Sequence, residues 1–210
     1  MNKTLDYLRP RMTSQGFQIM TTLLKGVPFR VWRKPTSSTL KYHHKDDGKC
    51  LSVIGHTYEM IVAAYTSQMR IFEWYDSGIP SKSSDAMTIG IMFHDAFKYG
   101  SDGKGVRAKW ANGPDDGERY TDTNHACIAY VYLVDHRATL EDYFGAKLTE
   151  KIMMIVRLHE GRWSPIYGKD RNSRADQYIL EARHREIFTV HSLDMASANN
   201  TLHVPKEFRR

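Results

Sequence analysis

Six histidine and aspartate side chains stand out along the chain as candidate metal ligands, and two of them are adjacent. His94 and Asp95 stand at the end of the apolar segment "IGIMFHDAFKYG", residues 89–100, and Lys98 follows Asp95 by about one helical turn. On its own this dipeptide favours a buried core histidine beside an Asp95–Lys98 ion pair, because short motifs often match by chance. The chemistry of the segment therefore depends on what accompanies it elsewhere in the sequence.

The other four candidates, His56, His125, His159 and Asp194, make a metal centre the favoured interpretation. The histidines lie at the ends of predicted helices. Asp194 lies among apolar neighbours, where a carboxylate is costly unless it is paired or bound to a metal. Several imidazoles with one or two carboxylates suit one or two divalent ions, among Mn, Fe, Ni, Co, Zn and Mg. With two ions, Asp95 would be the bridge, and the pair would clamp a phosphoryl group and activate the attacking water.

Helices are predicted to position these side chains. Apolar residues recur at a period near 3.6 in five segments, which are 56–75, 84–95, 125–136, 149–160 and 173–198. Residues 1–14 predict a short helix or a loose arm, and the apolar runs 17–24 and 27–35 predict strands or irregular packing. A β-hairpin or long loop is predicted over 105–124, around the turn "NGPDDG". The predicted fold class is therefore all-α, a mainly helical bundle with a small β-hairpin insertion.

The composition is that of an ordinary soluble globular protein. The chain has 210 residues, of which 41% are hydrophobic and 26% charged, enough for one domain or one domain plus an appendage. It has no apolar run of about 18 residues and no apolar N-terminal signal, so no membrane partner is expected. Only Cys50 and Cys127 are present, which implies no disulfide framework and makes the cytoplasm the expected compartment. The net charge of +6 and the pI of about 9.2 favour a polyanionic partner, such as a nucleotide or nucleic acid.

The order of the ligand-type residues resembles that of the HD-domain metal-dependent phosphohydrolase superfamily. Five segments are similar to one branch of it, which contains 3′-to-5′ exoribonucleases and related bacterial and phage hydrolases. They are "YHHKDDGKCLSVIGHTYEM", "FHDAFKYG", "TNHACIAYVYL", "RLHEGRWSP" and "VHSLDMASAN". The resemblance implies an HD-domain helical bundle over residues 35–200, preceded by an N-terminal arm or extension, 1–34, and followed by a tail, 201–210.

The resemblance also implies a set of metal ligands. The basic ligands of the superfamily correspond to His56, His94, Asp95 and Asp194, and the extra histidines of its two-metal members correspond to His125 and His159. The branch often has glycines beside the first of these extra histidines, where this chain has Asn124 and Ala126. Glu160 follows the second, in place of another histidine or a hydrophobic residue. The alternative for His125 and His159 is a place in the core or behind the ligands, without contact to a metal.

Further residues are candidates for contact with the substrate. Lys98 corresponds to a lysine that branch members place near the substrate phosphate, where it would act as a point charge. Phosphomonoesterase members often have glutamate at this position, which favours phosphodiesters here. One of His43 and His44, in the predicted loop, would reach the phosphate or the leaving group as a general acid; the alternative is an exposed polar loop. Arg162 and Trp163 would steer and stack the substrate, with a solvated surface and core packing as the alternatives.

The sequence thus predicts a metal-dependent phosphohydrolase that cleaves a phosphoester of a nucleotide or a short nucleic acid. The phosphodiesterase or nuclease type is favoured over a nucleotidase or a deoxynucleoside triphosphate triphosphohydrolase. From another class, the alternative is a catalytically degenerate module that binds nucleotides or nucleic acid. The complete order of ligand types favours an enzyme over this module.

Overall fold

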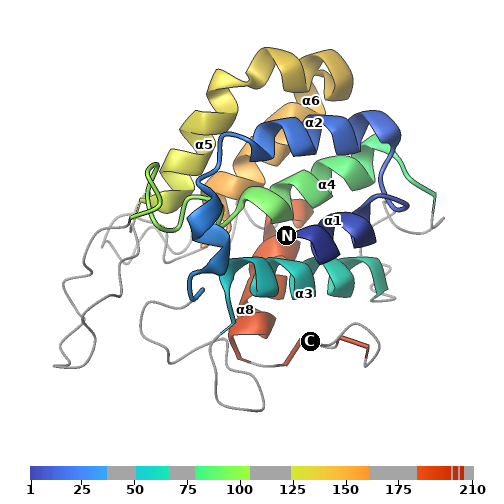
Figure 1. Cartoon of the computed structure of the whole chain (residues 1–210). Helices are drawn as coiled ribbons and strands as arrows, with labels where there is room; N and C mark the ends of the chain where they lie inside the picture. Colours follow the sequence, from blue (N-terminus) through green and yellow to red (C-terminus); the bar gives the residue numbers. More distant parts are fainter. Residues whose placement is uncertain are drawn as a thin grey trace, which may run out of the picture.

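The computed structural model describes residues 1–36, 51–66, 79–104, 124–160, 184–199, 201–202 and 204–205. Within these ranges the chain is all-α, which confirms the predicted fold class, and the helices pack around one apolar core (Figure 1). The elements are α1 (Asn2–Leu8), α2 (Ser14–Leu24), the 3₁₀ helix η1 (Phe29–Arg33), α3 (Val53–Thr66), α4 (Lys82–Phe93), α5 (His125–Asp135), α6 (Arg137–Leu158) and α8 (Arg185–Ala198). The hairpin predicted over 105–124 lies outside the described residues, except for Asn124.

Helix α4 runs through the middle of the bundle and contacts α2, α3, α6 and α8. All of its residues from 84 to 93 are buried, as expected for a helix that is apolar on nearly all sides. Gly90 allows α6 to approach closely, because a Cβ at this position would lie 2.8 Å from Cγ2 of Ile155. Helix α4 thereby carries His94 and Asp95, which follow its last residue, into the interior.

The start of α4 is fixed by a capping box. The helix begins at Lys82, two residues before the predicted start at residue 84, and Ser81 is its N-cap. Ser81 Oγ accepts a hydrogen bond from the backbone N–H of Ser84 at 3.1 Å, and Ser84 Oγ accepts one from the N–H of Ser81 at 2.9 Å. Asp85 instead points inward and accepts hydrogen bonds from the N–H and the hydroxyl of Thr13, at 3.2 Å and 2.5 Å. This carboxyl group ties α4 to the start of α2.

The strand or irregular packing predicted for residues 17–24 is wrong, because they lie within α2. Thr13 caps this helix by accepting a hydrogen bond from the N–H of Gly16 at 3.0 Å. Its buried side chains follow a helical spacing, and they are Ile19, Met20 and Leu23. The β-branched residues of the segment imitate a strand, but tertiary packing overrides such local preferences. Of the two alternatives predicted for residues 27–35, the strand is wrong, because this segment contains the 3₁₀ helix η1. Of the short helix or loose arm predicted for residues 1–14, the helix is confirmed as α1.

The helices of the second half differ from their predicted bounds mainly at the ends. Helix α5 begins and ends as predicted, to within one residue. Helix α6 starts at Arg137, well before the predicted start at residue 149, and it bends at Gly145, whose φ of 73° favours glycine. Helices α3 and α8 lie within or near their predicted segments, 56–75 and 173–198. The rest of those two segments lies outside the described residues.

The N-terminal segment contributes side chains to the same core as the rest of the chain. Leu8, Met20 and Trp32 are almost completely buried and belong to that core. The division of the chain into an arm, a domain and a tail stays a prediction.

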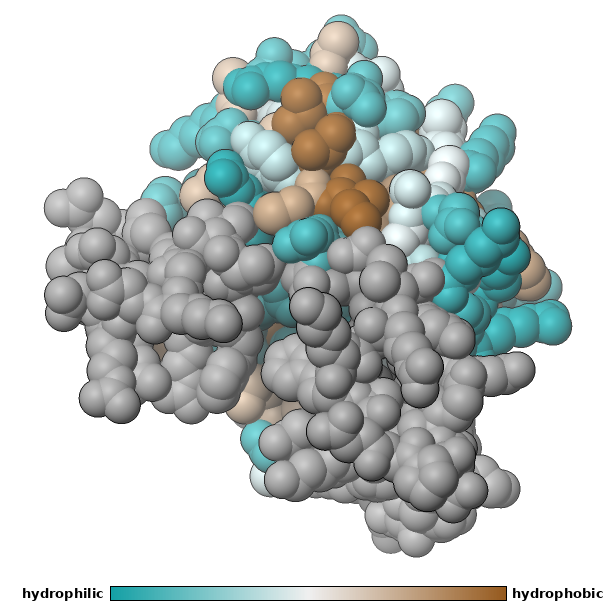
Figure 2. All heavy atoms as spheres, turned by 90° about the vertical axis from the view of Figure 1, so that its left-hand side faces the viewer, coloured by the Kyte–Doolittle hydropathy of each residue, from teal (hydrophilic) through white to brown (hydrophobic). Residues whose placement is uncertain are grey.

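The described surface carries isolated apolar side chains. Figure 2 shows the side of the molecule that lies on the left of Figure 1, where a few hydrophobic side chains stand among hydrophilic ones. Helix α5 lies on this side and exposes 56% of Val131 and 39% of Val134. Such scattered exposure is ordinary for a globular protein. None of the helices in the described ranges combines the length and the apolar character needed to cross a bilayer.

Candidate metal centre

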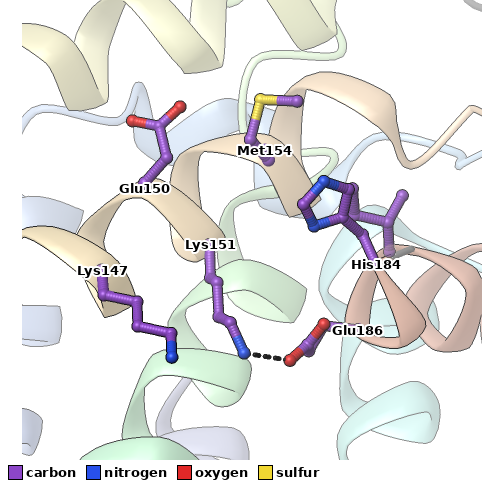
Figure 3. A pocket seen from close by; sticks show the side chains of 7 residues that line it. Lys147, Glu150, Lys151, Met154, His184 and Glu186 are labelled. Atoms are coloured by element: carbon purple, nitrogen blue, oxygen red, sulfur yellow. Dashed lines mark hydrogen bonds and ion pairs between the residues drawn. The ribbon is translucent and has the colours of Figure 1, made fainter. Parts of the chain in front are cut away.

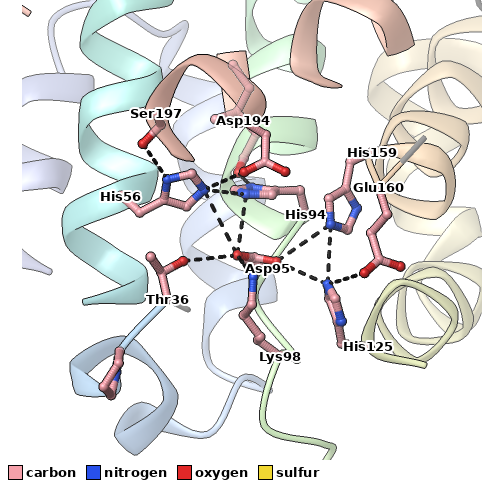
Figure 4. A network of polar contacts seen from close by, with 12 residues as sticks. Thr36, His56, His94, Asp95, Lys98, His125, His159, Glu160, Asp194 and Ser197 are labelled. Atoms are coloured by element: carbon pink, nitrogen blue, oxygen red, sulfur yellow. Dashed lines mark hydrogen bonds and ion pairs between the residues drawn. The ribbon is translucent and has the colours of Figure 1, made fainter. Parts of the chain in front are cut away.

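Seven predicted functional side chains converge in the interior of the bundle (Figure 4). They come from α3, from the turn that follows α4, from the start of α5, from the end of α6 and from α8. They are His56, His94, Asp95, Lys98, His125, His159 and Asp194. The four histidines and Asp95 are at most 4% exposed. Five separate elements therefore place all the predicted ligands at one site.

Asp95 is the centre of this arrangement. Its Oδ2 atom faces two histidines, with Nε2 of His94 at 3.7 Å and Nε2 of His56 at 4.0 Å. Its Oδ1 atom faces two others, with Nε2 of His125 at 3.1 Å and Nε2 of His159 at 3.5 Å. The two oxygens of one carboxylate thus serve two pairs of imidazoles on opposite sides.

Two groups of three side chains are compact enough to hold a metal ion. One group is His56, His94 and Asp95, and the other is Asp95, His125 and His159. All five residues are buried, and Asp95 belongs to both groups. The site can therefore hold a metal ion in either group, as the sequence predicted.

Hydrogen bonds at Nδ1 orient two of the imidazole rings, so that their Nε2 atoms point into the site. Nδ1 of His94 lies 2.6 Å from the carbonyl oxygen of Ile91, and Nδ1 of His159 lies 2.8 Å from that of Val156. A carbonyl oxygen only accepts hydrogen bonds, so each Nδ1 carries the proton and donates it. In the neutral ring, Nε2 then presents a bare lone pair to the interior, which is the state that a metal ligand requires.

The spacing of the Nε2 atoms fits a metal ion. Nε2 of His56 and of His94 are 3.1 Å apart, and Nε2 of His125 and of His159 are 3.3 Å apart. Two nitrogens that each lie about 2.0–2.1 Å from one ion are separated by about 3.0 Å at a right angle and about 3.4 Å at a tetrahedral angle. Both observed separations lie in this range, so each histidine pair fits the divalent metal ion that the sequence implies.

The electrostatics of the site favour a cation. Burial lowers the pKa of His94 to about 3, so this ring is neutral at physiological pH. Burial alone would lower the pKa of His159. The polar contact with Asp95 and the negative charges of Glu160 and Asp95 outweigh burial, so the pKa of His159 is raised. Asp95 Oδ1 is a buried acceptor that makes no hydrogen bond of good geometry with the described residues. Lys98 and Thr36 compensate the other oxygen of this carboxylate, and a metal ion between Oδ1 and the two histidines would compensate this one.

Lys98 and Asp194 complete the site at its more exposed side. Nζ of Lys98 lies 2.7 Å from Oδ2 of Asp95, and its side chain is 17% exposed. Burial would raise the pKa of Asp95, but the neighbouring ammonium outweighs it and holds this pKa well below its usual range. Asp194 Oδ1 lies 3.1 Å from Nε2 of His56, and this side chain is 20% exposed. Asp95 is therefore ionised at neutral pH, and Asp194 is close enough to join His56 as a ligand.

Three further residues of the site were not assigned to it from the sequence. Ser197 Oγ lies 2.8 Å from Nδ1 of His56, and the hydroxyl of Thr36 donates to Asp95 Oδ2 at 3.3 Å. Glu160 Oε1 lies 3.7 Å from Nε2 of His125. Ser197 follows Asp194 by three residues, so a search of the same helical face would have found it. Nothing in the sequence marks Thr36, because a long-range backbone contact brings it to the site.

That contact joins the end of the η1 segment to the start of α3. The N–H of Thr36 donates to the carbonyl of Leu51 at 2.8 Å, and the N–H of Val53 donates to the carbonyl of Lys34 at 2.8 Å. Four of the predicted substrate-contacting residues cannot be placed, since they lie outside the described part of the chain: His43, His44, Arg162 and Trp163.

A second depression lies between α6 and α8 (Figure 3). Its lining includes Lys147, Glu150, Met154, His184 and an ion pair between Lys151 and Glu186. Charges of opposite sign line this depression and are partly paired. Among the described residues, no group of its histidine and glutamate side chains is compact enough to hold a metal ion, in contrast to the centre around Asp95.

Comparisons with known proteins add no relative. No family model, no curated protein and no solved structure matches this chain.

Proposed function

We propose that this chain is a metal-dependent phosphohydrolase whose centre holds two divalent ions, one on each side of Asp95. The observation that carries the proposal is the division of the Asp95 carboxylate between two histidine pairs. A single carboxylate placed in this way is the bridging ligand that two-ion hydrolytic centres use. The resemblance of the ligand order to the HD-domain phosphohydrolases supports the same reading.

The residues divide into two ligand sets. His56, His94 and Asp194 would hold one ion together with Asp95 Oδ2, and His125 and His159 would hold the other together with Asp95 Oδ1. Four imidazoles favour a first-row ion such as Mn, Fe, Co, Ni or Zn over Mg, which prefers oxygen ligands. When bound, the ions would polarise the phosphoryl group and make a water molecule nucleophilic at neutral pH.

Lys98 contributes the charge that the substrate meets. Burial would lower the pKa of Lys98, but Asp95 outweighs it and raises this pKa, so the ammonium stays charged. Because the side chain is 17% exposed, it can offer a further hydrogen bond to an oxygen of an incoming phosphate. A fixed ammonium at this place stabilises the negative charge on the phosphoryl oxygens during the reaction.

A phosphodiester in a nucleotide or a nucleic acid is the favoured substrate. The net charge of +6 favours a polyanion. Lys98 stands where phosphomonoesterases of the resembled superfamily often have glutamate, and a cation suits the single negative charge of a diester. A panel of mononucleotides, deoxynucleoside triphosphates, short oligonucleotides and cyclic dinucleotides, read by product chromatography, distinguishes this proposal from a nucleotidase or a triphosphohydrolase.

The experiment that tests the function is hydrolysis of bis(p-nitrophenyl) phosphate by metal-stripped protein with Mn²⁺ added back. We expect turnover that requires the ion, and we expect Asp95→Ala to reduce turnover to the background rate. Asp135→Ala, which removes an exposed carboxylate at the end of α5, is the matched control and should keep the full rate. Full turnover by Asp95→Ala at saturating Mn²⁺ would rule the mechanism out.

A further inference from the structure

A groove lies beside the metal centre, where α1, η1 and the first turn of α3 meet. Its walls include Lys3, Phe29, Arg33 and Ile54, and Trp32 forms part of its lining. The groove has a volume of about 490 Å³. None of the described residues that line it is acidic.

An exposed aromatic ring stands at this groove. Phe29 is 61% exposed, although it is one of the largest apolar side chains of the described residues. The guanidinium carbon of Arg33 lies 5.2 Å from the centre of its ring. An exposed ring with an adjacent cation is the combination on which an unpaired base stacks while its phosphate is neutralised. Trp32 next to it is 2% exposed and anchors η1 in the core.

The two cations that line the groove have no acidic partner within the described part of the chain. Lys3 and Arg33 form no ion pair with any described residue. Lys34, in contrast, donates to the carbonyl of Lys104 at 3.2 Å and is held there. The side chains that face the groove therefore create a positive potential that attracts a polyanion.

The groove is tied to the metal centre through the backbone of the η1 segment. Thr36, which donates to Asp95, is three residues from Arg33, so their Cα atoms are at most about 11 Å apart. On the other side, η1 packs against the turn at Gly103, where a Cβ would lie 2.9 Å from Cβ of Pro28. That turn follows Lys98 by a few residues. The positions of groove and centre are thus fixed relative to each other.

We propose that this groove binds the part of a single-stranded nucleic acid that adjoins the phosphodiester at the metal centre. Arg33 and Lys3 contact backbone phosphates, and Phe29 stacks on an unpaired base. The inference rests on the proposed function and names its substrate class: a strand of several nucleotides is favoured over a mononucleotide, because only a strand reaches both the groove and the centre.

The test is binding of a fluorescein-labelled single strand of about ten nucleotides, measured by fluorescence anisotropy in EDTA so that no cleavage occurs. Phe29→Ala should weaken binding about fivefold or more, since stacking on one aromatic ring contributes at least about 1 kcal/mol. Arg33→Gln should weaken binding and lower the slope of log affinity against log salt by about 0.7, the value for one phosphate contact.

Two matched controls remove the same kinds of group elsewhere. Phe188→Ala removes a phenylalanine of α8 that is 50% exposed, and Lys147→Gln removes an exposed cation of α6. Both controls should bind the strand like the wild type. A duplex of the same sequence should bind more weakly than the strand, because its bases are not free to stack on Phe29.

The outcomes separate the groove from the proposed catalytic function. Hydrolysis of bis(p-nitrophenyl) phosphate, which is too small to reach the groove, should be unchanged by Phe29→Ala and Arg33→Gln. If both variants bind the strand as the controls do, or if the wild type does not bind it, the proposal that the groove binds a single strand is wrong, whatever the hydrolysis shows. If the variants lose binding while the wild type fails to hydrolyse the small diester, the groove stands and the hydrolase proposal fails.

Discussion

The hydroxyl of Ser197 gives a quantitative test of how the ligands are held. Ser197 is 2% exposed, and its Oγ lies 2.8 Å from Nδ1 of His56. When Nε2 of His56 binds an ion, the ring proton must reside on Nδ1, which then donates to this hydroxyl. Ser197→Ala removes that acceptor from a buried position.

Ser197→Ala should destabilise the metal-bound state more than the metal-free state. Loss of the partner of a buried donor costs about 1–3 kcal/mol, and each 1.4 kcal/mol is a factor of ten in affinity. We therefore expect Ser197→Ala to weaken metal binding about 5- to 150-fold. In the metal-free protein the loss is smaller, because His56 can move its proton to Nε2, which lies 3.1 Å from both His94 Nε2 and Asp194 Oδ1.

The assay is competition for Co²⁺ or Zn²⁺ against a fluorescent chelator of known affinity. Ser84→Ala is the matched control, because Ser84 is also 2% exposed but belongs to the capping box of α4. It should lower the free energy of unfolding by about 1 kcal/mol and leave metal affinity unchanged. Wild-type affinity in Ser197→Ala, or an equal loss of affinity in both variants, would show that this hydroxyl does not support His56 as a metal ligand.

Three other predictions concern stability. Gly16→Ala should lower the free energy of unfolding in urea by about 1–3 kcal/mol or more, because the new Cβ would lie 2.1 Å from Oδ2 of Asp85; a gain in stability, usual for this substitution in a helix, would contradict the packing. Burial raises the pKa of Asp85 above its ordinary value of 3.8, although the hydrogen bonds from Thr13 oppose this shift. The protonated carboxyl therefore contributes its full stability below about pH 3.8, and this contribution is lost as the pH rises through the raised pKa. The unfolding free energy of the wild type relative to Asp85→Asn should therefore fall between acidic and neutral pH, and a rise would contradict this. Adding Mn²⁺ at about 100 times its Kd should stabilise the metal-stripped wild type by about 2.7 kcal/mol in thermal unfolding, whereas Asp95→Ala should show little of this gain.

Some of the residues that converge at the centre could be singled out from the sequence by their surroundings, whereas His125 and His159 were assigned through the resemblance to a known superfamily. His94 and Asp95 end an apolar helix, and Asp194 lies among apolar residues, so their polar side chains are conspicuous where burial is expected. The all-α class followed from the same apolar periodicity. The sequence does not show which histidines lie on the same side of Asp95, because the division of its carboxylate between two histidine pairs depends on how five separate elements meet.

The missed features depend on contacts between distant segments. The sequence of α2 resembled a strand because its β-branched residues are visible in the local sequence. The packing of this helix against α4 and α6 involves residues far away in the sequence and is not visible there. Thr36 reaches Asp95 only because the backbone of residues 34–36 pairs with that of residues 51–53. Phe29 is apolar and precedes the buried Trp32 by three residues, so its 61% exposure could not be expected from the sequence.

Anomalous diffraction from crystals grown with Mn²⁺ would show whether Asp95 bridges two ions. We expect two anomalous peaks, one between Asp95 Oδ2 and the His56–His94 pair and one between Asp95 Oδ1 and the His125–His159 pair. Crystals of Asp135→Ala should show the same two peaks. A single peak at this cluster, or no peak at saturating Mn²⁺, would show that Asp95 does not bridge two ions.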